Sequence, residues 1–404
     1  MKGRSFFLSR RCGDIILITG AISVIAVGTH IATVHRLAVQ RIIFPIEAVL
    51  SWHVESCSAD APHWLKALLG PVSRSAGALA GQIAYVSPSG KLVHCQRGWR
   101  NGLWSEPVTA DTRFRFASTT KVLTADAVLA AANEGRLSLD DLLLDYLPEV
   151  SSPDDERLNG VTLRHLLQHA GGFDRLVTPD TMFAHGSEPW CPGDIPHLQR
   201  TTLDFDPGTR YAYGNLGYCL LGVVLERVYG EPFRVLMARR YPLADLGLAF
   251  LDGPYLADEV HYDFRNSDFY TMNYHRHFHF QALSSSASLS GSASGYARLL
   301  YSALTRAPHS LRSEDVRVPC ERAVLRSCYG YTFNIYQQEE DSLVAFIQGG
   351  NLIGATSLVV VDSLGGVLVW VGNGMPRKVQ LQMDQIKERV YRALSNQYAA
   401  RTLD

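Results

Sequence analysis

The chain has 404 residues, and 47% of them are hydrophobic, which suffices for a large globular unit of one or two subdomains. Lysine and arginine total 38 against 39 for aspartate and glutamate, so the net charge at neutral pH is close to zero. No basic stripe interleaved with aromatic residues occurs. Composition and charge therefore argue against a nucleic acid as the partner.

The first predicted element is an apolar run over 15–34, "IILITGAISVIAVGTHIATV". An apolar stretch of about 20 residues spans a bilayer as a helix. The basic residues before it favour a cytosolic N-terminus over 1–14. A cleaved signal peptide is the alternative, because small residues stand at 26–28. Both readings place the rest of the chain outside the cytosol, and the anchor reading predicts a single-pass protein of a bacterial inner membrane that faces the periplasm or cell exterior.

The cysteines fit an exported protein. The sequence has seven, and all except Cys12 follow the apolar run. An even number of exported cysteines permits a set of disulfides, whose connectivity the sequence leaves open. Cys219 has a second reading as a small buried hydrophobe, because it lies in an apolar helical run. The absence of a Cys-x-x-Cys pair argues against a zinc site.

The next segments predict the start of a folded domain. Residues 35–78 form a connector with a short helix at "HWLKALLG", and the domain is expected over 79–397. "GQIAYVSPSGKLVHCQRGW" (81–99) predicts two strands joined by a Ser-Pro-Ser-Gly turn. A helix is expected after Ser118, with Gly135 as its C-terminal stop.

The middle of the chain is predicted to be helical and the last third to be β-rich. "VTLRHLLQHAGGF" (161–173) begins as an amphipathic helix, and "PGTRYAYGNLGYCLLGVVLERVYG" (207–230) passes from a loop into a helix. "YGYTFNIYQ", "SLVAFIQGG", "ATSLVVVD" and "GVLVWVGN" predict an antiparallel meander, followed by a helix from about residue 377. These elements predict one α/β unit, with an antiparallel sheet completed by both chain ends and flanked by helices, and an all-helical subdomain.

A single lysine, Lys121, lies three residues after Ser118 in "FRFASTTKVLTADAVLAAANEG". No other lysine occurs between Lys91 and Lys378, where the chain otherwise uses arginine. Three residues are nearly one helical turn, so the two side chains share a face. A buried lysine can give up its proton, unlike arginine, and can activate a serine hydroxyl. The pattern predicts nucleophilic catalysis, against the alternative of a serine cap beside an exposed lysine.

Three ordered segments carry a family resemblance. "FRFASTTKVLTADAVLAAANEGRLSLDDLLLDYLPEV" resembles the first motif region of the serine β-lactamase and penicillin-recognising enzyme superfamily. "VTLRHLLQHAGGF" is similar to the helix and glycine turn that follow in this family, and "PGTRYAYGNLGYCLLG" to its second motif, Tyr-x-Asn, here Tyr213-Gly214-Asn215. The resemblance covers about residues 80–390 and is greatest to class C β-lactamases, D-Ala-D-Ala carboxypeptidases and related esterases. It implies a β-lactamase/transpeptidase-like fold.

The resemblance also implies roles for the motif residues. Ser118 would attack a carbonyl carbon and form an acyl-enzyme, with its own backbone N–H in the oxyanion hole. Tyr213 would act as general base and later as acid, provided that Lys121 lies beside it to favour the phenolate. Asn215 would hold Lys121 and orient the substrate. No cofactor is implied.

The third motif departs from the family pattern. β-Lactamases carry Lys-Thr/Ser-Gly on a strand beside the nucleophile, and many relatives carry His-x-Gly. Here the corresponding stretch is Gln348-Gly349-Gly350, predicted to contact substrate. Glutamine carries no charge, which weakens the case for binding a substrate carboxylate, although an arginine from elsewhere is an open alternative. The strand backbone near residue 351 is expected to complete the oxyanion hole.

Histidines at 275, 277 and 279 in "HRHFHF" raise the alternative of a metal site, because alternate residues of a strand share one face. Without acidic residues at ligand spacing, no metal is expected. The sequence therefore predicts a membrane-anchored, exported serine hydrolase that cleaves a small ester or amide. The alternatives are a penicillin-binding D-Ala-D-Ala peptidase or β-lactamase acting on cell-wall peptides or drugs, and a non-catalytic peptidoglycan- or ligand-binding protein.

Overall fold

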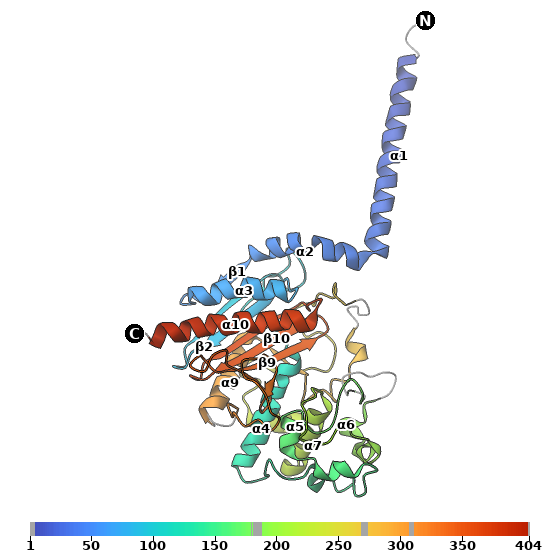
Figure 1. Ribbon diagram of the computed structural model, residues 1–404. Helices are drawn as coiled ribbons and strands as arrows, with labels where there is room; N and C mark the ends of the chain where they lie inside the picture. Colours follow the sequence, from blue (N-terminus) through green and yellow to red (C-terminus); the bar gives the residue numbers. More distant parts are fainter. Residues whose placement is uncertain (1–4, 179, 181–187, 268–273, 307–310, 403–404) are drawn as a thin grey trace. The chain divides into compact units, whose positions relative to one another are not determined.

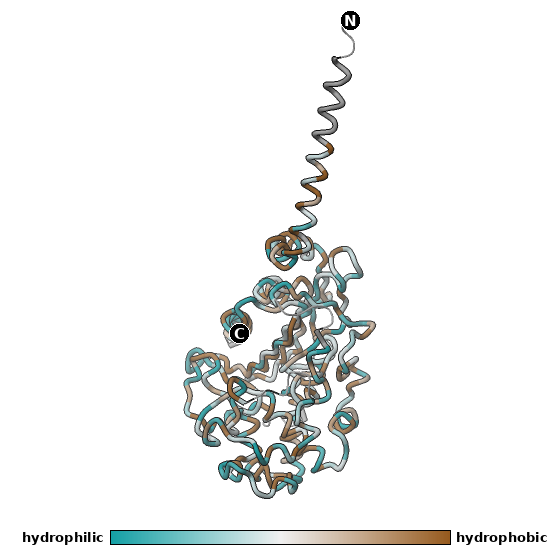
Figure 2. Tube along the Cα trace, turned by 90° about the vertical axis from the view of Figure 1, so that its right-hand side faces the viewer, coloured by the Kyte–Doolittle hydropathy of each residue, from teal (hydrophilic) through white to brown (hydrophobic). Residues whose placement is uncertain are grey.

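The computed structural model describes residues 5–178, 180, 188–267, 274–306 and 311–402, and the chain divides into two units at residues 47 and 48. The first unit holds helix α1 (Ser5–Val34) and the start of α2 (Arg36–Trp52). Large apolar side chains of α1 are exposed, among them Ile18, Ile22 and Val24. Figure 2 colours each residue of the chain by its hydropathy, and hydrophobic residues recur along the coloured part of α1.

The prediction that residues 15–34 form a single membrane-spanning helix is not confirmed. Within the described residues, no helix alone has the length and apolar character needed to cross a bilayer, whereas the bent pair Ile18–Ile31 and Arg36–Ser51 meets that requirement together.

The second unit is built on one large antiparallel sheet (Figure 1). Its strand order is β1-β3-β2-β11-β10-β9-β8-β7. The early and late parts of the chain meet where β2 pairs with β11, with Ile83 opposite Trp370. The strands are β1 (Glu55–Cys57), β2 (Gly81–Val86), β3 (Leu92–Arg97), β7 (Cys328–Tyr329), β8 (Asn334–Tyr336), β9 (Ala345–Leu352), β10 (Ala355–Asp362) and β11 (Val367–Gly372). The predicted sheet completed by both chain ends is confirmed.

Helices cover both faces of this sheet. On β11, Leu368 and Trp370 belong to the core under α3 (His63–Ser75) and α10 (Val379–Thr402), whereas Val369 belongs to the core on the opposite face. This alternation is the period of two expected for a strand buried on both sides. The predicted connector over 35–78 thus includes α2, the edge strand β1 and α3.

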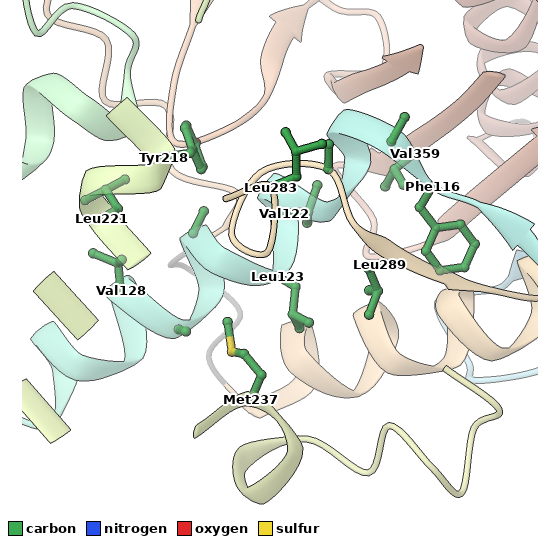
Figure 3. Close-up of a cluster of buried hydrophobic side chains, with 14 of the residues drawn as sticks. Phe116, Val122, Leu123, Val128, Tyr218, Leu221, Met237, Leu283, Leu289 and Val359 are labelled. Atoms are coloured by element: carbon green, nitrogen blue, oxygen red, sulfur yellow. The ribbon is translucent and has the colours of Figure 1, made fainter. Parts of the chain in front are cut away.

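The core on the Val369 face of the sheet includes the helical lobe. There, α4 (Thr120–Asn133) packs against α7 (Leu216–Tyr229), and α7 packs against α8 (Phe233–Arg240). Figure 3 shows Val122 and Val128 of α4 together with Leu221 of α7 in this core, and these side chains are fully buried. A three-stranded sheet, β4-β6-β5, lies at its edge. The elements not yet given are α5 (Leu163–Leu167), α6 (Trp190–Gly193), α9 (Ala293–Arg306), β4 (Phe114–Arg115), β5 (Ala249–Phe250) and β6 (Leu289–Gly291).

Several local predictions are confirmed, and the extent of one helix is wrong. Gly135 and Gly230, both at positive φ, follow the ends of α4 and α7 as predicted. The helix predicted over 161–173 is limited to Leu163–Leu167, because His169 takes a positive φ of 51° and ends it. The strand that was only an alternative for the histidine segment is not formed at Tyr274–His277, which is a 3₁₀ turn, so alternate residues there do not share a face.

All six cysteines that follow the N-terminal apolar run are paired. The disulfides are Cys57–Cys95, Cys191–Cys219 and Cys320–Cys328. The first joins β1 to β3, and the second ties α6 to α7, which resolves the two readings of Cys219 in favour of a disulfide.

Candidate active site

Ser118 lies in a 3₁₀ turn, Ala117–Thr119, that leads directly into α4. Ala117 has a positive φ of 49°, which marks a tight turn before the serine. This turn rests against β9 at Gly350, where an added Cβ would lie 2.6 Å from Phe116 O and 3.1 Å from Ser118 N. Glycine is therefore required at 350, because any side chain would push the strand away from the serine backbone.

Lys121 is fully buried one helical turn after Ser118. Its Nζ donates hydrogen bonds to Asn215 Oδ1 at 2.6 Å and to Ser286 O at 3.1 Å. A buried ammonium group needs such acceptors, because desolvation without them costs several kcal/mol, about 2–7 for a neutral group and more for a charge. The predicted contact between Asn215 and Lys121 is present in the structure.

Asn215 also contacts a residue that the sequence analysis missed. It lies at the N-terminus of α7, and its Nδ2 donates to Asp180 Oδ1 at 2.9 Å. The amide must present its oxygen to the ammonium and its N–H to the carboxylate, so the two neighbours together fix its orientation. Asp180 thus extends the network to Lys121–Asn215–Asp180. It follows the glycine turn after α5, and no sequence pattern distinguishes it.

Tyr213 stands over Lys121 without a hydrogen bond to it. Lys121 Nζ lies 5.0 Å from the centroid of the phenol ring, a cation–π distance. Among the described residues, Tyr213 Oη has no hydrogen-bond partner although the atom is buried. Within the described residues, Ser118 Oγ also forms no hydrogen bond to Lys121 or to Tyr213. Such contacts often form only when substrate binds.

A buried histidine supports the tyrosine. His169 packs its ring 4.5 Å from the Tyr213 ring, centroid to centroid, and 5.0 Å from that of Tyr329. Its backbone oxygen accepts from Ala212 N at 2.9 Å, which holds the Tyr213 loop against the glycine turn. Burial, with the charges of Lys121 and Arg175 added, holds the pKa of His169 well below its usual value, so the ring is neutral.

The third motif alternates its side chains between the two faces of β9. Gln348 and Gly350 face the Ser118 turn, whereas Gly349 faces α10, where an added Cβ would lie 3.6 Å from Lys387 Cε. Gln348 is 2% exposed; its Nε2 donates to Ser118 O at 3.4 Å, and its Oε1 accepts from Tyr329 Oη at 3.2 Å. Both ends of this amide are thus used inside the protein, so its predicted contact with substrate stays a prediction.

The serine-rich segment 284–295 turns out to be core. Ser286 and Ser288 are fully buried, and Ser285 O accepts from Thr124 Oγ1 on α4 at 2.7 Å. Small residues let this segment pass close to α7, because an added Cβ at Gly222 would lie 2.8 Å from Ser285 Oγ. Its low complexity gave no sign that it supplies Ser286 O to Lys121.

Two other features could form a site: a metal-binding cluster and a surface groove. Among the residues the structure describes, no cluster of three His, Cys, Asp or Glu side chains could hold a metal ion. The side chain of His275 lies outside that description. A groove of about 640 Å³ runs between α3 and α10, lined by Trp64, Pro71 and Arg389 among others. It lies on the face of the sheet away from Ser118, so it is not part of this site.

Known proteins resemble this chain over all or part of its length. The family model described as Beta-lactamase matches residues 67–390. The putative fimbrial assembly protein FimD, serogroup D, of Dichelobacter nodosus is 37% identical over 97% of this chain and 98% of its own length. Esterase EstB of Burkholderia gladioli is 31% identical over 38% of this chain and 42% of its own. The D-amino acid amidase of Ochrobactrum anthropi SV3, solved with L-phenylalanine amide, superposes with a TM-score of 0.66 at 18% identity, over 84% of this chain and all of the amidase.

Proposed function

The chain belongs to the Beta-lactamase family of serine hydrolases, and we propose that it is a membrane-anchored, exported member that cleaves an ester or amide through an acyl-enzyme on Ser118. The observation that carries this proposal is Lys121, which is fully buried one turn from Ser118, held by Asn215 and covered by the Tyr213 ring. A lysine held one turn from a serine can take part in the transfer of the serine proton, which an arginine cannot.

The proposed reaction has two steps. Ser118 Oγ attacks the carbonyl carbon while its proton passes to the Lys121–Tyr213 pair, and the developing oxyanion is bound by Ser118 N–H and a β9 amide near residue 351. Tyr213 then protonates the leaving alcohol or amine as its bond to the carbonyl carbon breaks. Water, activated by the same pair, hydrolyses the acyl-enzyme and regenerates Ser118.

The test is covalent labelling of the full-length chain in detergent with a fluorophosphonate probe, read by intact mass. We expect one adduct on the wild type and none on Ser118→Ala, because only an activated serine reacts at a useful rate. A neighbouring hydroxyl supplies the matched control: Thr119→Ser should label like the wild type. A folded wild-type protein that takes up no probe contradicts the proposal and favours the non-catalytic binding protein.

Membrane anchoring rests on α1, whose apolar side chains over residues 18–31 are exposed, and on the basic residues that precede them. We expect the chain to fractionate with the inner membrane and to resist extraction at alkaline pH, with the hydrolase unit open to protease from the periplasmic side. A mature N-terminus near residue 29 would instead establish the cleaved signal peptide.

A role in fimbrial assembly is the second candidate. The observation that favours it is that the match to the putative FimD protein extends over 97% of this chain, beyond the hydrolase unit alone. We propose that the hydrolase reaction serves the building of a fibre at the cell surface. Deletion of the gene should reduce surface fimbriae, and complementation with Ser118→Ala should fail to restore them. Full restoration by Ser118→Ala would separate the assembly role from catalysis.

A further inference from the structure

Arg175 lies at the second motif of the site. It follows the glycine turn after α5, and its guanidinium carbon is 5.2 Å from the centroid of the Tyr213 ring. Its Cβ is also close to Gly214, where an added Cβ would lie 3.8 Å away. Lys121 and Arg175 thus both contact the Tyr213 ring, the lysine from the buried interior and the arginine from an exposed position.

The guanidinium of Arg175 has no acceptor among the described residues. The adjacent carboxylate is turned elsewhere, because Asp174 accepts from Arg210 at 3.2 Å and from Leu176 N at 3.0 Å. Arg157 in the same lobe, in contrast, forms ion pairs with Asp155 and Asp206. Arg175 therefore presents up to five unused donors beside the reacting groups.

The local electrostatics favour an anion at this edge. Lys121 and Arg175 both lower the pKa of His169, which shows that their positive charges act together on the interior of the site. A cleft with uncompensated charge of one sign attracts ligand groups of the opposite sign. An arginine fork matches the two oxygens of a carboxylate, so a bidentate contact is the favoured geometry.

On the opposite edge of the site the described cations are already paired: Arg326, whose charge acts to lower the pKa of Tyr211, forms an ion pair with Asp384 at 2.9 Å. Gln348 is uncharged and is engaged with Ser118 O and Tyr329 Oη. The nearest lysine behind β9 is Lys387, but it lies on the far face beside Gly349 and within 3.7 Å of Asp384. A cation that meets substrate from solvent therefore comes from the Tyr213 side.

We infer that Arg175 binds a carboxylate of the substrate, from the Tyr213 side of the site and not from β9. This inference rests on the proposed function, since it assumes that Ser118 is acylated. It assigns Arg175 as a specificity-determining residue, which accelerates acylation only for substrates that carry the anion.

The test uses matched thioesters that differ only in one negative charge. One pair places the carboxylate on the leaving group, as an acyl thioglycolate and its methyl ester. The other places it on the acyl group, as a succinyl thioester and its methyl ester. Released thiol gives kcat/KM for each. We expect the wild type to prefer the charged member of one pair by about 10–100-fold, the range for a hydrogen-bonded charge pair.

Arg175→Gln should remove that preference: kcat/KM for the charged member should fall by about 10–100-fold relative to kcat/KM for the neutral member of the same pair. Arg175→Lys keeps the charge without the fork and should retain only part of the preference. The matched control is Arg200→Gln, an exposed arginine of the same lobe that contacts none of the site residues described above, and it should behave as the wild type.

Fluorophosphonate labelling separates the two proposals. If Ser118 is labelled, yet charged and neutral thioesters react equally or Arg175→Gln keeps the preference, the inference about Arg175 is wrong and the hydrolase stands. If Ser118 takes up no probe, the proposed function fails first. If the probe reacts but neither thioester turns over, protection of Ser118 by succinate decides: it must slow labelling of the wild type and not of Arg175→Gln, and equal rates overturn the inference.

Discussion

The two sides of the Lys121 ammonium differ in how completely their polar groups are satisfied. Toward α7, Lys121, Asn215 and Asp180 form a continuous hydrogen-bonded series with distances of 2.6 and 2.9 Å. Toward the Tyr213 loop, the phenol oxygen has no partner and the Arg175 guanidinium has no acceptor among the described residues. The polar groups on the first side are hydrogen-bonded without substrate, whereas those on the second side can still form hydrogen bonds to a ligand.

The satisfied side is suited to position Lys121, whereas the unsatisfied side holds the groups that we propose take part in the reaction. A satisfied network holds a buried charge in one place, and removing one member leaves the others unpaired. An unpartnered hydroxyl beside the nucleophile has a cost in the free protein, and function is a physical reason to keep it. Substitutions on the two sides should therefore differ in their balance between lost stability and lost activity.

The largest effect is expected at Lys121 itself. Lys121→Arg keeps the charge but holds its proton, so we expect the rate of Ser118 acylation to fall by about 10³-fold or more. The measurement is the time course of probe labelling by intact mass. Because arginine is larger than the buried lysine, Lys121→Met is the second variant, with thermal unfolding as the check on folding. Normal turnover by either folded variant would show that proton transfer through Lys121 is not needed.

Tyr213→Phe removes only the unpartnered hydroxyl. We expect acylation to slow by about 100-fold, as for the loss of a general acid–base group, while the unfolding temperature stays the same or rises. Labelling kinetics and a thermal melt on one preparation measure both. A large loss of stability would mean that the hydroxyl has a partner in solution.

Asn215→Leu is the matched change on the satisfied side. It keeps the side-chain volume but leaves Lys121 and Asp180 without their shared amide, so we expect a loss of about 2 kcal/mol in the free energy of unfolding. Urea unfolding at pH 7.5 measures it. Equal stability of Asn215→Leu and Tyr213→Phe would remove the distinction between the two sides.

Asp180→Asn should have a smaller effect. A neutral amide at 180 no longer fixes which end of Asn215 faces Lys121, so we expect acylation to slow by about tenfold, a typical cost for a supporting hydrogen-bond partner. Asp206→Asn is the control, because Asp206 is an exposed carboxylate of the same lobe that pairs with Arg157. A positioning role predicts a changed pH profile for the Asp180 variant; an unchanged profile with lower stability would indicate a purely structural role.

The smallest effect concerns pH and His169. Its pKa is lowered in the folded protein by burial, so below the ordinary value of about 6.5 the unfolded chain binds a proton that the folded protein does not. Stability from this group is complete above pH 6.5 and is lost as the pH falls. His169→Asn, which suits the positive φ, should lose about 1 kcal/mol less between pH 7.5 and 5.5 in urea unfolding. Parallel losses in both proteins would show that His169 does not titrate as described.

Local signals in the sequence determined much of the scaffold and singled out Ser118 as the candidate nucleophile. The spacing of Ser118 and Lys121 predicts a shared helical face, and alternating or continuous apolar runs predict β2, β3, β9, β10 and β11. The glycines after α4 and α7 mark helix ends for the same reason. Each of these signals acts within a few residues along the chain. Over that distance, residue type largely determines backbone geometry and the pattern of burial.

The tertiary structure alone decided which distant groups meet. Asp180 and Ser286 reach the site through hydrogen bonds that join positions 35 and 165 residues apart, and no local pattern marks either one. The glutamine of the third motif turns inward, and an arginine from another loop meets the Tyr213 ring, because the direction of a side chain depends on its packed neighbours. The sequence by itself determined the serine, the lysine and the elements that carry them. Long-range packing decided which partners orient these residues, and it placed the charge of Arg175 beside the Tyr213 ring. No short stretch of sequence encodes such packing.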